Sequence, residues 1–419
     1  MIPLQHRGRR LPQAGVRPRR PVRQEPALRR GHRLVQPRER AERPDPARGG
    51  GHAARAAPRQ EHDARENPGR AQHDSRGEDE HRSPTHSRST GRMIVRALPA
   101  AGREVAVTFD DLPVVSVTRW DVASHRAITT RLLYAIAAHA VPAVGFVNEE
   151  NLLADGVTDP ARVDMLRQWL DAGLELANHT FAHLDLHETP IERFEADVVR
   201  GEPVLRELLR ARGMALRYFR HPYLHTGTDL ATKRRLEALL AARGCSIAPV
   251  TVDVEDYLFA QAYDRAVELG RHGMARQVAE AFVSHVESKF AYHEDLSRRL
   301  LGYEVRQVLL LHANSINAER FDALAHMLER RGYTFVTLER ALADGAYAAA
   351  DDYARPDGIG WLQRWALNRG RPEHFLDGEP VTPRWVRVRA GEGWEGRIVR
   401  WMARMHRARR RIMGMKAAA

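Results

Sequence analysis

The 419-residue chain is basic, with a formal net charge of +12, but the charge is unevenly distributed. Residues 1–92 carry 22 arginines and 11 acidic residues, and residues 355–419 carry 15 basic and 6 acidic residues, whereas residues 93–354 have a net charge of −8. Basic charge outside the globular segment is weak evidence for nucleic-acid recognition. We therefore expect no specific nucleic-acid partner, although a non-specific contact through the N-terminal tail stays open.

Cysteine usage and hydropathy exclude further classes. Cys245 is the only cysteine, so the chain forms no internal disulfide and no cysteine-based zinc knuckle. The sequence contains no apolar run of about 18 residues, so we expect no transmembrane segment. Its N-terminus lacks the apolar stretch of a secretory signal peptide. Compartment and oligomeric state stay open.

Residues 1–92 have the composition of a disordered segment. They are rich in Arg, Pro, His, Gly and Gln and contain no Phe, Tyr or Trp. Such a segment cannot bury enough apolar surface to offset the entropy cost of ordering, so we expect a disordered basic tail. The composition changes abruptly just before Met93. This change favours a sharper hypothesis, in which translation starts at Met93 or upstream in another frame and residues 1–92 are not native coding sequence.

From residue 105 onward, strand-like and helix-like segments alternate about seven times. Apolar, β-branched runs predict strands at 105–109, 143–147, 174–178, 216–220, 247–253, 307–312 and 334–336. Helices are predicted at about 122–139, 160–172, 190–211, 230–243, 261–289 and 320–331. This alternation predicts an α/β fold with a parallel sheet, closed or nearly closed into a barrel, which we place at residues 93–350.

Residues 351–419 are predicted to be a partly helical, basic extension. Five tryptophans suggest that part of it folds against the barrel: Trp361, Trp365, Trp385, Trp394 and Trp401. Residues 396–416 form a basic amphipathic run. We interpret this run as a solvated helix face, with binding to a membrane surface or a partner as the alternative.

Polar residues collect where the predicted strands end. Asp110 and Asp111 follow the first strand. Other strands are followed by His179 and His183, by Arg220 and His221, by Asp253 and Asp256, and by His312. In a parallel barrel the carboxyl ends of the strands meet at one face and carry the chemistry. Because successive side chains of a strand alternate in direction, Asp110 and Asp111 can reach one centre only past the strand end.

The spacing of His179 and His183 is compatible with a metal site. On a helical turn, positions i and i+4 share one face, so both imidazoles can ligate one ion. In a chain with 21 histidines, capping or surface histidines explain such a pair equally well when it is taken alone. Beside two aspartates, the pair favours a catalytic site of two histidines and one carboxylate that keeps a position for water.

The other strand ends supply candidates for positioning and proton transfer. Arg220 can orient a carboxylate through two parallel hydrogen bonds, although a surface arginine beside the turn residue Pro222 is an equal alternative. His312 ends an apolar run and is either a buried, satisfied histidine or a general acid at the barrel mouth. Asp253 and Asp256 are candidate partners, but acidic residues after strands are also common helix N-caps.

Taken in order, the five clusters resemble the motifs of the polysaccharide deacetylase family, the NodB-homology carbohydrate esterases of family 4. The matching segments are 108–111, 179–183, 220–223, 253–257 and 310–312, within about residues 103–345. The resemblance implies a distorted (β/α)7 barrel. It also implies a metal-dependent hydrolase that acts on carbon–nitrogen bonds other than peptide bonds. Its reaction would remove acetyl groups from an N-acetylated or O-acetylated carbohydrate by attack of a metal-bound water.

The resemblance also implies a set of metal ligands. Carried over by position, these are Asp111, His179 and His183. The expected cofactor is a divalent metal ion, Zn²⁺ first, with Co²⁺, Ni²⁺ or Mn²⁺ as alternatives.

The catalytic roles follow from the same resemblance. Asp110 is implied as the base that activates water, and His312 as the acid that protonates the departing amine or alkoxide. Arg220 is implied to orient Asp110, and Asp256 to hold His312 or Arg220 in place.

Around the substrate the sequence departs from the family pattern. Leu112 and Pro113 follow the two aspartates where the family usually has glycine, and Tyr257 stands where it usually has tryptophan. The backbone N–H of Tyr223 is the implied oxyanion donor, and Pro222 and Tyr257 the implied substrate neighbours. These departures leave the reaction class unchanged but open the identity of the substrate.

The expected partner is therefore an acetylated carbohydrate or another small amide or ester. Two alternatives remain: an amidase or esterase that uses the same site on a non-sugar substrate, and a catalytically inactive carbohydrate-binding barrel. The family that the chain resembles is often extracytoplasmic.

Overall fold

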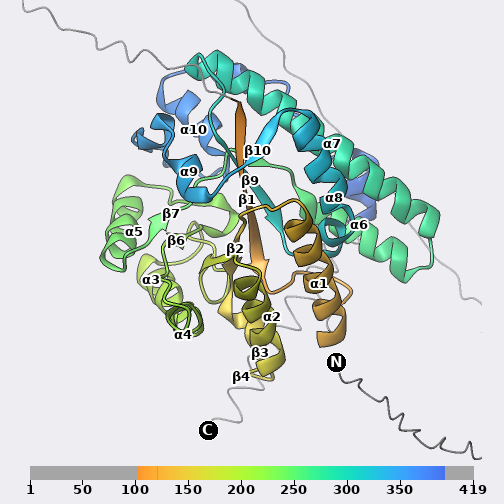
Figure 1. The fold of residues 1–419 in the computed structure, drawn as a ribbon. Helices are drawn as coiled ribbons and strands as arrows, with labels where there is room; N and C mark the ends of the chain where they lie inside the picture. The colour runs from red at the N-terminus through yellow and green to blue at the C-terminus, as the bar shows by residue number, and fades with distance from the viewer. Residues whose placement is uncertain (1–101, 120, 392–419) are drawn as a thin grey trace, which may run out of the picture. The chain divides into compact units, whose positions relative to one another are not determined.

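The computed structural model describes residues 102–119 and 121–391 (Figure 1). The expected tail at 1–92 and the basic run at 396–416 lie outside the described residues. None of the helices in the described part of the chain is both long and apolar enough to span a membrane.

The elements alternate as predicted. The strands are β1 (Arg103–Leu112), β2 (Val144–Val147), β3 (Leu153–Ala154), β4 (Val157–Thr158), β5 (Glu175–Asn178), β6 (Tyr218–Phe219), β7 (Ser246–Ile247), β8 (Val252–Asp253), β9 (Gln307–His312) and β10 (Tyr333–Phe335). The α-helices are α1 (Val122–Ala138), α2 (Pro160–Asp171), α3 (Ile191–Arg200), α4 (Pro203–Arg210), α5 (Leu230–Ala242), α6 (Asp256–Glu268), α7 (His272–Leu301), α8 (Ser315–Arg330), α9 (Leu338–Leu342), α10 (Trp361–Asn368) and α11 (Arg384–Arg389). Short 3-10 helices are η1 (Glu149–Leu152), η2 (Pro222–Leu224), η3 (Gly345–Ala348) and η4 (Glu373–Leu376).

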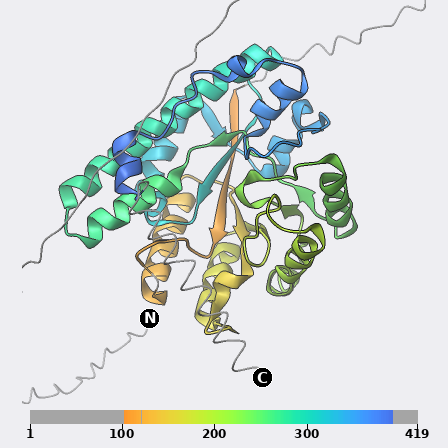
Figure 2. The ribbon, with the colours of Figure 1, turned by 180° about the vertical axis from the view of Figure 1, so that it is seen from behind.

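The main sheet is parallel and curls into a half-barrel, and the helices surround it (Figures 1 and 2). Within the described residues its strand order is β7-β6-β5-β2-β1-β9-β8, and β10 pairs with the start of β1. The central strand β1 pairs with β9 on one side and with β2 on the other. The α/β barrel predicted from the sequence is therefore confirmed. A separate antiparallel pair, β3 and β4, lies between β2 and α2 in the chain.

The single strand predicted at 247–253 is wrong. This segment forms two short strands at opposite edges of the sheet: β7 pairs with β6, and β8 pairs with β9. Residues 248–251 link the two edges. In the described part of the chain β7 and β8 do not pair, so the barrel is not closed by hydrogen bonds there.

Side-chain alternation along β1 separates two cores. Val105, Val107 and Phe109 face the surrounding helices, where they join the largest apolar cluster. Ala106 faces the barrel interior with residues of β2, β5 and β9. Thr108 shares the direction of Ala106, so the same alternation brings polar groups into the interior near the end of the strand.

The helices begin at capping residues and are interrupted at glycines. Asp121, Asp159, Asp229 and Asn314 accept a backbone N–H at the starts of α1, α2, α5 and α8, which typically stabilises a helix start by about 1 kcal/mol. The helix predicted at 190–211 is divided into α3 and α4, and that at 261–289 into α6 and α7. Gly201 and Gly270 stand at these breaks, because glycine weakens a helix.

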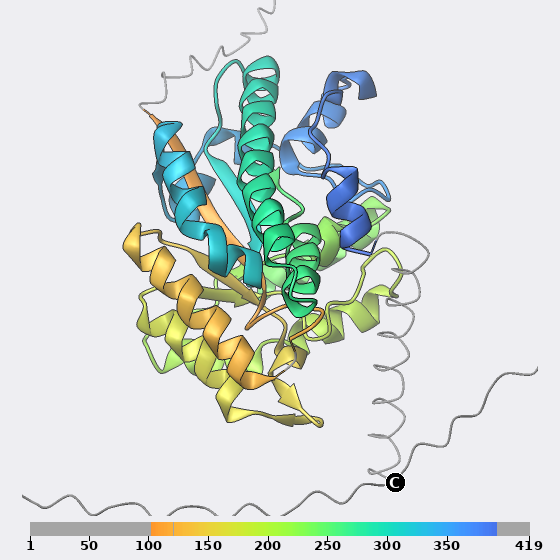
Figure 3. The ribbon, with the colours of Figure 1, turned by 90° about the vertical axis from the view of Figure 1, so that its right-hand side faces the viewer.

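The described part of the C-terminal extension packs on the barrel beside α7 (Figure 3). Trp361, Leu362 and Trp365 of α10 form an apolar cluster with Val250, which lies in the link between β7 and β8, and with residues of α7. The Trp361 N–H also donates to the Val250 carbonyl at 2.7 Å. Burying each large apolar side chain contributes roughly 1.5–3 kcal/mol. The extension thus covers the place where the sheet stays open.

Candidate active site

Asp110 and Asp111 both lie inside β1, so the expectation that they follow the strand end is wrong. Between Phe109 and Leu112 the strand holds one more residue than the partner stretch of β2, which is a β-bulge. Asp111 accordingly has a left-handed backbone, with φ of 62°. A bulge re-aims a side chain that alternation would point away. It thereby lets two consecutive carboxylates face one centre.

Asp111, His179 and His183 form one cluster. Oδ1 of Asp111 lies 3.6 Å from Nε2 of His179 and 3.5 Å from Nε2 of His183. Nδ1 of His179 contacts the Arg220 carbonyl at 2.9 Å, so a proton on Nδ1 leaves the Nε2 lone pair facing the cluster. The Asp111 Oδ1 atom is buried and accepts no hydrogen bond from the described residues.

The two histidines lie in a loop after β5, not on the helical turn assumed in the sequence argument. Thr180 and His183 have φ of 66° and 53°, in the left-handed region. The Asn178 side chain accepts the Thr180 N–H at 2.7 Å, and the Thr180 hydroxyl accepts the His183 N–H at 3.0 Å. Gly201 packs directly on this loop, since a Cβ there would lie 2.6 Å from the Thr180 carbonyl carbon.

The protonation states of His179 and Asp111 favour binding of a cation. Burial, and then the neighbouring His183, lower the pKa of His179 to about 3, so its imidazole is neutral as a metal ligand must be. Burial opposes ionisation of Asp111, but the nearby imidazoles, His183 first, hold its pKa below the usual value. Two imidazole nitrogens and one carboxylate oxygen are the donor set of a catalytic zinc site, so these residues fit a divalent metal ion.

Arg220 lies in the barrel interior and is completely buried. Its Nη1 donates to Asp110 at 3.2 Å and to the Thr108 hydroxyl at 2.9 Å, and its Nε donates to the Ala248 carbonyl at 3.1 Å. The guanidinium also lies 4.4 Å from the centre of the Phe146 ring. The surface alternative for Arg220 is therefore excluded.

Asp110 is held with a raised proton affinity. Burial raises its pKa to about 7, although the positive charges of Arg220 and His312 oppose the shift. Its Oδ2 lies 3.7 Å from Nε2 of His179, so Asp110 borders the Asp111-His179-His183 cluster. A carboxylate with a pKa near neutrality is suited to accept and return a proton.

His312 lies beside Asp110, because these two residues are paired in register between β9 and β1. Its Nδ1 contacts Asp256 at 2.6 Å, and its backbone N–H donates to the same carboxylate at 2.8 Å. Burial alone would lower the pKa of His312, but the Asp256 carboxylate raises it to about 10. Asp256 thus contacts His312, one of the two partners expected for it.

Two residues missed by the sequence argument complete this arrangement. The side-chain amides of Asn314 and Asn317 donate to Asp256 at 2.9 and 2.5 Å. Only the position of Asn314, two residues after His312, gave any sequence signal. The four donors leave Asp256 fully engaged, so its carboxylate is fixed while it orients the imidazole.

Aromatic side chains surround the mouth of the site. Tyr223 and Tyr257 are 55% and 41% exposed, with rings 4.6 Å from that of His183 and 6.1 Å from that of His312. Pro222 begins η2, in which Tyr223 has φ of 58°. Each non-glycine residue with a left-handed backbone costs about 1–3 kcal/mol of conformational strain and persists only where its surroundings enforce that conformation.

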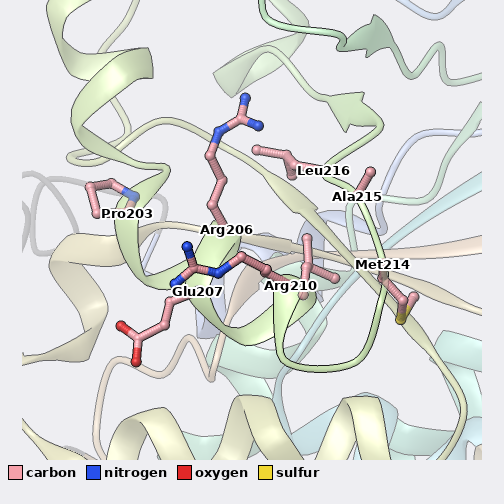
Figure 4. A pocket seen from close by; sticks show the side chains of 8 residues that line it. Pro203, Arg206, Glu207, Arg210, Met214, Ala215 and Leu216 are labelled. Carbon is pink, nitrogen blue, oxygen red and sulfur yellow. The ribbon is translucent and has the colours of Figure 1, made fainter.

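Two other features do not belong to this cluster. Asp185, His187 and His225 lie close together, but the rings of His187 and His225 are stacked at 3.9 Å with 7° between their planes. Their lone pairs therefore lie in two separate, nearly parallel planes, so they do not converge on one ion. A surface pocket on α4 and the segment before β6 contains no candidate catalytic residue (Figure 4). It is lined by Pro203, Arg206, Glu207, Leu209, Arg210, Met214, Ala215 and Leu216.

The fold and the cluster define a parallel half-barrel with an Asp-His-His group at the carboxyl ends of its strands. Residues 98–239 match the family model described as polysaccharide deacetylase. This part of the chain is therefore similar to the polysaccharide deacetylase family, which confirms the resemblance seen in the sequence. A comparison with curated proteins finds no match.

Several solved structures are similar. A mutant of BA3943 from Bacillus anthracis, described as a CE4 family pseudoenzyme with restored enzymatic activity, is 15% identical, with 58% of this chain and 68% of that chain covered and a TM-score of 0.40. A family 4 carbohydrate esterase from Streptomyces lividans, in complex with acetate, is 21% identical, with 56% and 91% covered and a TM-score of 0.36. The peptidoglycan deacetylase PdaC from Bacillus subtilis is 18% identical, with 57% and 92% covered and a TM-score of 0.37.

The raised pKa of His312 predicts a pH-dependent stability. Its pKa is about 10 in the folded chain, against about 6.5 for an unperturbed histidine. Protonated His312 therefore stabilises the fold fully below about pH 6.5, and this contribution is lost as the pH rises toward 10. In metal-free protein we expect Asp256→Asn to lower the free energy of unfolding by roughly 3–5 kcal/mol near pH 6 and by less near pH 10.

Urea unfolding in the presence of a chelator measures this difference across the pH range. Asp171→Asn, at an exposed carboxylate that pairs with Arg212, is the matched control and should show no such trend, because arginine stays charged across this pH range. A difference between wild type and Asp256→Asn that is equal at both ends of the range would contradict the assignment.

Proposed function

We propose that the chain is a metal-dependent hydrolase that removes acetyl groups from an N-acetylated or O-acetylated carbohydrate. The observation that carries this proposal is the convergence of Asp110 and the Asp111-His179-His183 group on one centre. Zn²⁺ is the metal we propose, because two imidazoles and one carboxylate are its usual catalytic ligands. When bound, such an ion lowers the pKa of water toward about 7 and polarises an acyl oxygen.

The residues around the metal group divide the proton transfers. Asp110, with its pKa raised to about 7, accepts a proton from the attacking water, and Arg220 keeps its carboxylate oriented. His312 carries a proton at neutral pH because Asp256 stabilises its charged form, so it can protonate the departing amine or alkoxide. The Tyr223 backbone N–H is the proposed donor to the developing oxyanion, while Pro222 and Tyr257 border the substrate.

The reaction class is tested by acetate release from acetylated chito-oligosaccharides, together with metal content. We expect the full chain to release acetate, a chelator to stop the release, and Zn²⁺ to restore it. Co²⁺, Ni²⁺ and Mn²⁺ are tested in the same way to identify the preferred ion. Bound metal without acetate release from sugars would move the proposal to other amides and esters. Absence of both would favour an inactive barrel.

Two substitutions separate the base from the metal ligands. Asp110→Asn should retain metal but lower kcat by about 10²–10⁴-fold, the usual contribution of a general base. His183→Ala should lose both metal and turnover, because it removes one of the three ligands. Asp171→Asn and His272→Ala, at exposed side chains outside any cluster of possible metal ligands in the described residues, are the matched controls. A fully active Asp110→Asn variant would show that another group is the base.

The acid role of His312 is tested by comparing leaving groups. His312→Ala should slow amide cleavage by about 10²-fold or more, but hydrolysis of an activated acetyl ester much less, since an activated leaving group needs little protonation. Both rates are measured on the same metal-loaded preparation. Equal losses on the two substrates would count against protonation by His312.

A further inference from the structure

The described part of the C-terminal extension is bonded to the loop that follows β6. Arg364 of α10 is completely buried, and its Nη1 donates to the Thr226 hydroxyl at 2.8 Å. Its Nη2 donates to the Leu224 carbonyl, and its Nε donates to the Ile359 carbonyl at 2.9 Å. One guanidinium therefore joins the extension to the two residues that come shortly after Tyr223.

The buried charge of Arg364 is compensated locally. Its Nη1 also lies 3.2 Å from Asp351, a carboxylate that Nζ of Lys233 contacts at 2.5 Å. The guanidinium stacks over Trp361 at 4.1 Å and over Tyr353 at 5.1 Å. A buried cation is tolerated when it is paired and hydrogen-bonded in this way, and such a network holds its members in one arrangement.

The second contact between the extension and the loop is made by the backbone of both segments. Gly358 lies so close to the loop that a Cβ at this position would be 2.1 Å from the Tyr223 carbonyl oxygen. Its φ is not in the left-handed region, so the glycine is required by this close approach and not by its own backbone conformation.

The loop needs such support because it is strained. Tyr223 and Leu224 are consecutive non-glycine residues with φ of 58° and 56°. Within the loop, the Leu224 N–H donates to the His221 carbonyl at 3.2 Å and the His225 N–H donates to the Pro222 carbonyl at 3.1 Å. Strained backbone persists only where its surroundings enforce it. Gly358 lies against Tyr223, and Arg364 donates to the Leu224 carbonyl.

We propose that residues 351–364 act as a clamp on the Tyr223–Thr226 loop, with Arg364 and Gly358 as positioning residues for the Tyr223 backbone N–H. This inference rests on the proposed function, in which that N–H stabilises the oxyanion. A donor that acts on the transition state affects kcat, whereas equal binding of substrate and transition state affects KM. Releasing the clamp therefore lowers kcat and leaves KM and metal content unchanged.

The sharpest test is Gly358→Ala, which pushes on the Tyr223 carbonyl without changing charge. Gly345→Ala is the matched control, since a Cβ at Gly345 meets no atom within 4 Å. Misplacing a catalytic group by about 1 Å can cost about 10²-fold in rate, so we expect a fall in kcat of at least about ten-fold for Gly358→Ala. KM and bound metal should change by less than about two-fold, and Gly345→Ala should match wild type.

If Gly358→Ala does not fold, two further variants test the same contact. Arg364→Lys retains the charge but loses the forked donors, and Thr226→Val removes one acceptor of the guanidinium. Amide hydrogen exchange of residues 223–227, measured well below the unfolding transition, reports the loop independently of turnover. Exchange there should rise in the clamp variants. Glu294→Gln, which weakens the buried ion pair between α7 and Arg331, should lower stability without this local change.

The outcomes distinguish this inference from the proposed function. Clamp variants that keep wild-type kcat would overturn it, whether or not their loop exchanges faster. Faster exchange together with reduced kcat would support it. If wild type releases no acetate at all, the proposed function fails. The exchange data then test only the physical contact. Faster exchange of residues 223–227 in the clamp variants would support this contact, and unchanged exchange would overturn it.

Discussion

Two consecutive carboxylates must face one centre in this protein, and an uninterrupted β-strand forbids that arrangement. Alternation sends Thr108 and Asp110 into the barrel and Phe109 into the helical layer, so Asp111 would also point outward. The extra residue in β1 removes this conflict and brings Oδ1 of Asp111 within reach of two imidazoles. The separation between the carboxylate beside Arg220 and the carboxylate of the Asp-His-His cluster therefore originates in the backbone of the central strand.

The buried guanidinium of Arg220 connects this strand to the rest of the site. An unpaired cation in the interior would cost several kcal/mol, so its hydrogen bonds to Asp110, Thr108 and Ala248 fix the positions of three segments at once. Its own carbonyl meanwhile holds the tautomer of His179. The positions of Asp110 and His179 thus both depend on Arg220, which explains why an arginine lies where apolar side chains would otherwise pack.

Most elements of the barrel could be predicted from the sequence, because the residues that define a strand or helix are neighbours in the chain. β9 begins and ends at the predicted residues, since an apolar run between polar residues needs no distant information. The segment 247–253 could not be predicted correctly, because its division between two sheet edges depends on pairing with β6 and β9. The candidate site was predicted by residue type, but not the bulge at Asp111 or the support of Asp256 by Asn317, which are properties of tertiary contacts.

Backbone strain explains why the extension belongs to the site. Left-handed non-glycine residues occur in β1 and in three loops of the site, among them Asp111, His183, Tyr223 and Glu255. At about 1–3 kcal/mol each, such conformations persist only through contacts that over-determine them. Some of the contacts on two of these loops come from the extension: Arg364 donates to the Leu224 carbonyl, and Thr382 donates to the Glu255 carboxylate at 2.8 Å. The barrel elements therefore supply the chemical groups, while the extension supplies part of the energy that keeps two loops in their strained conformations.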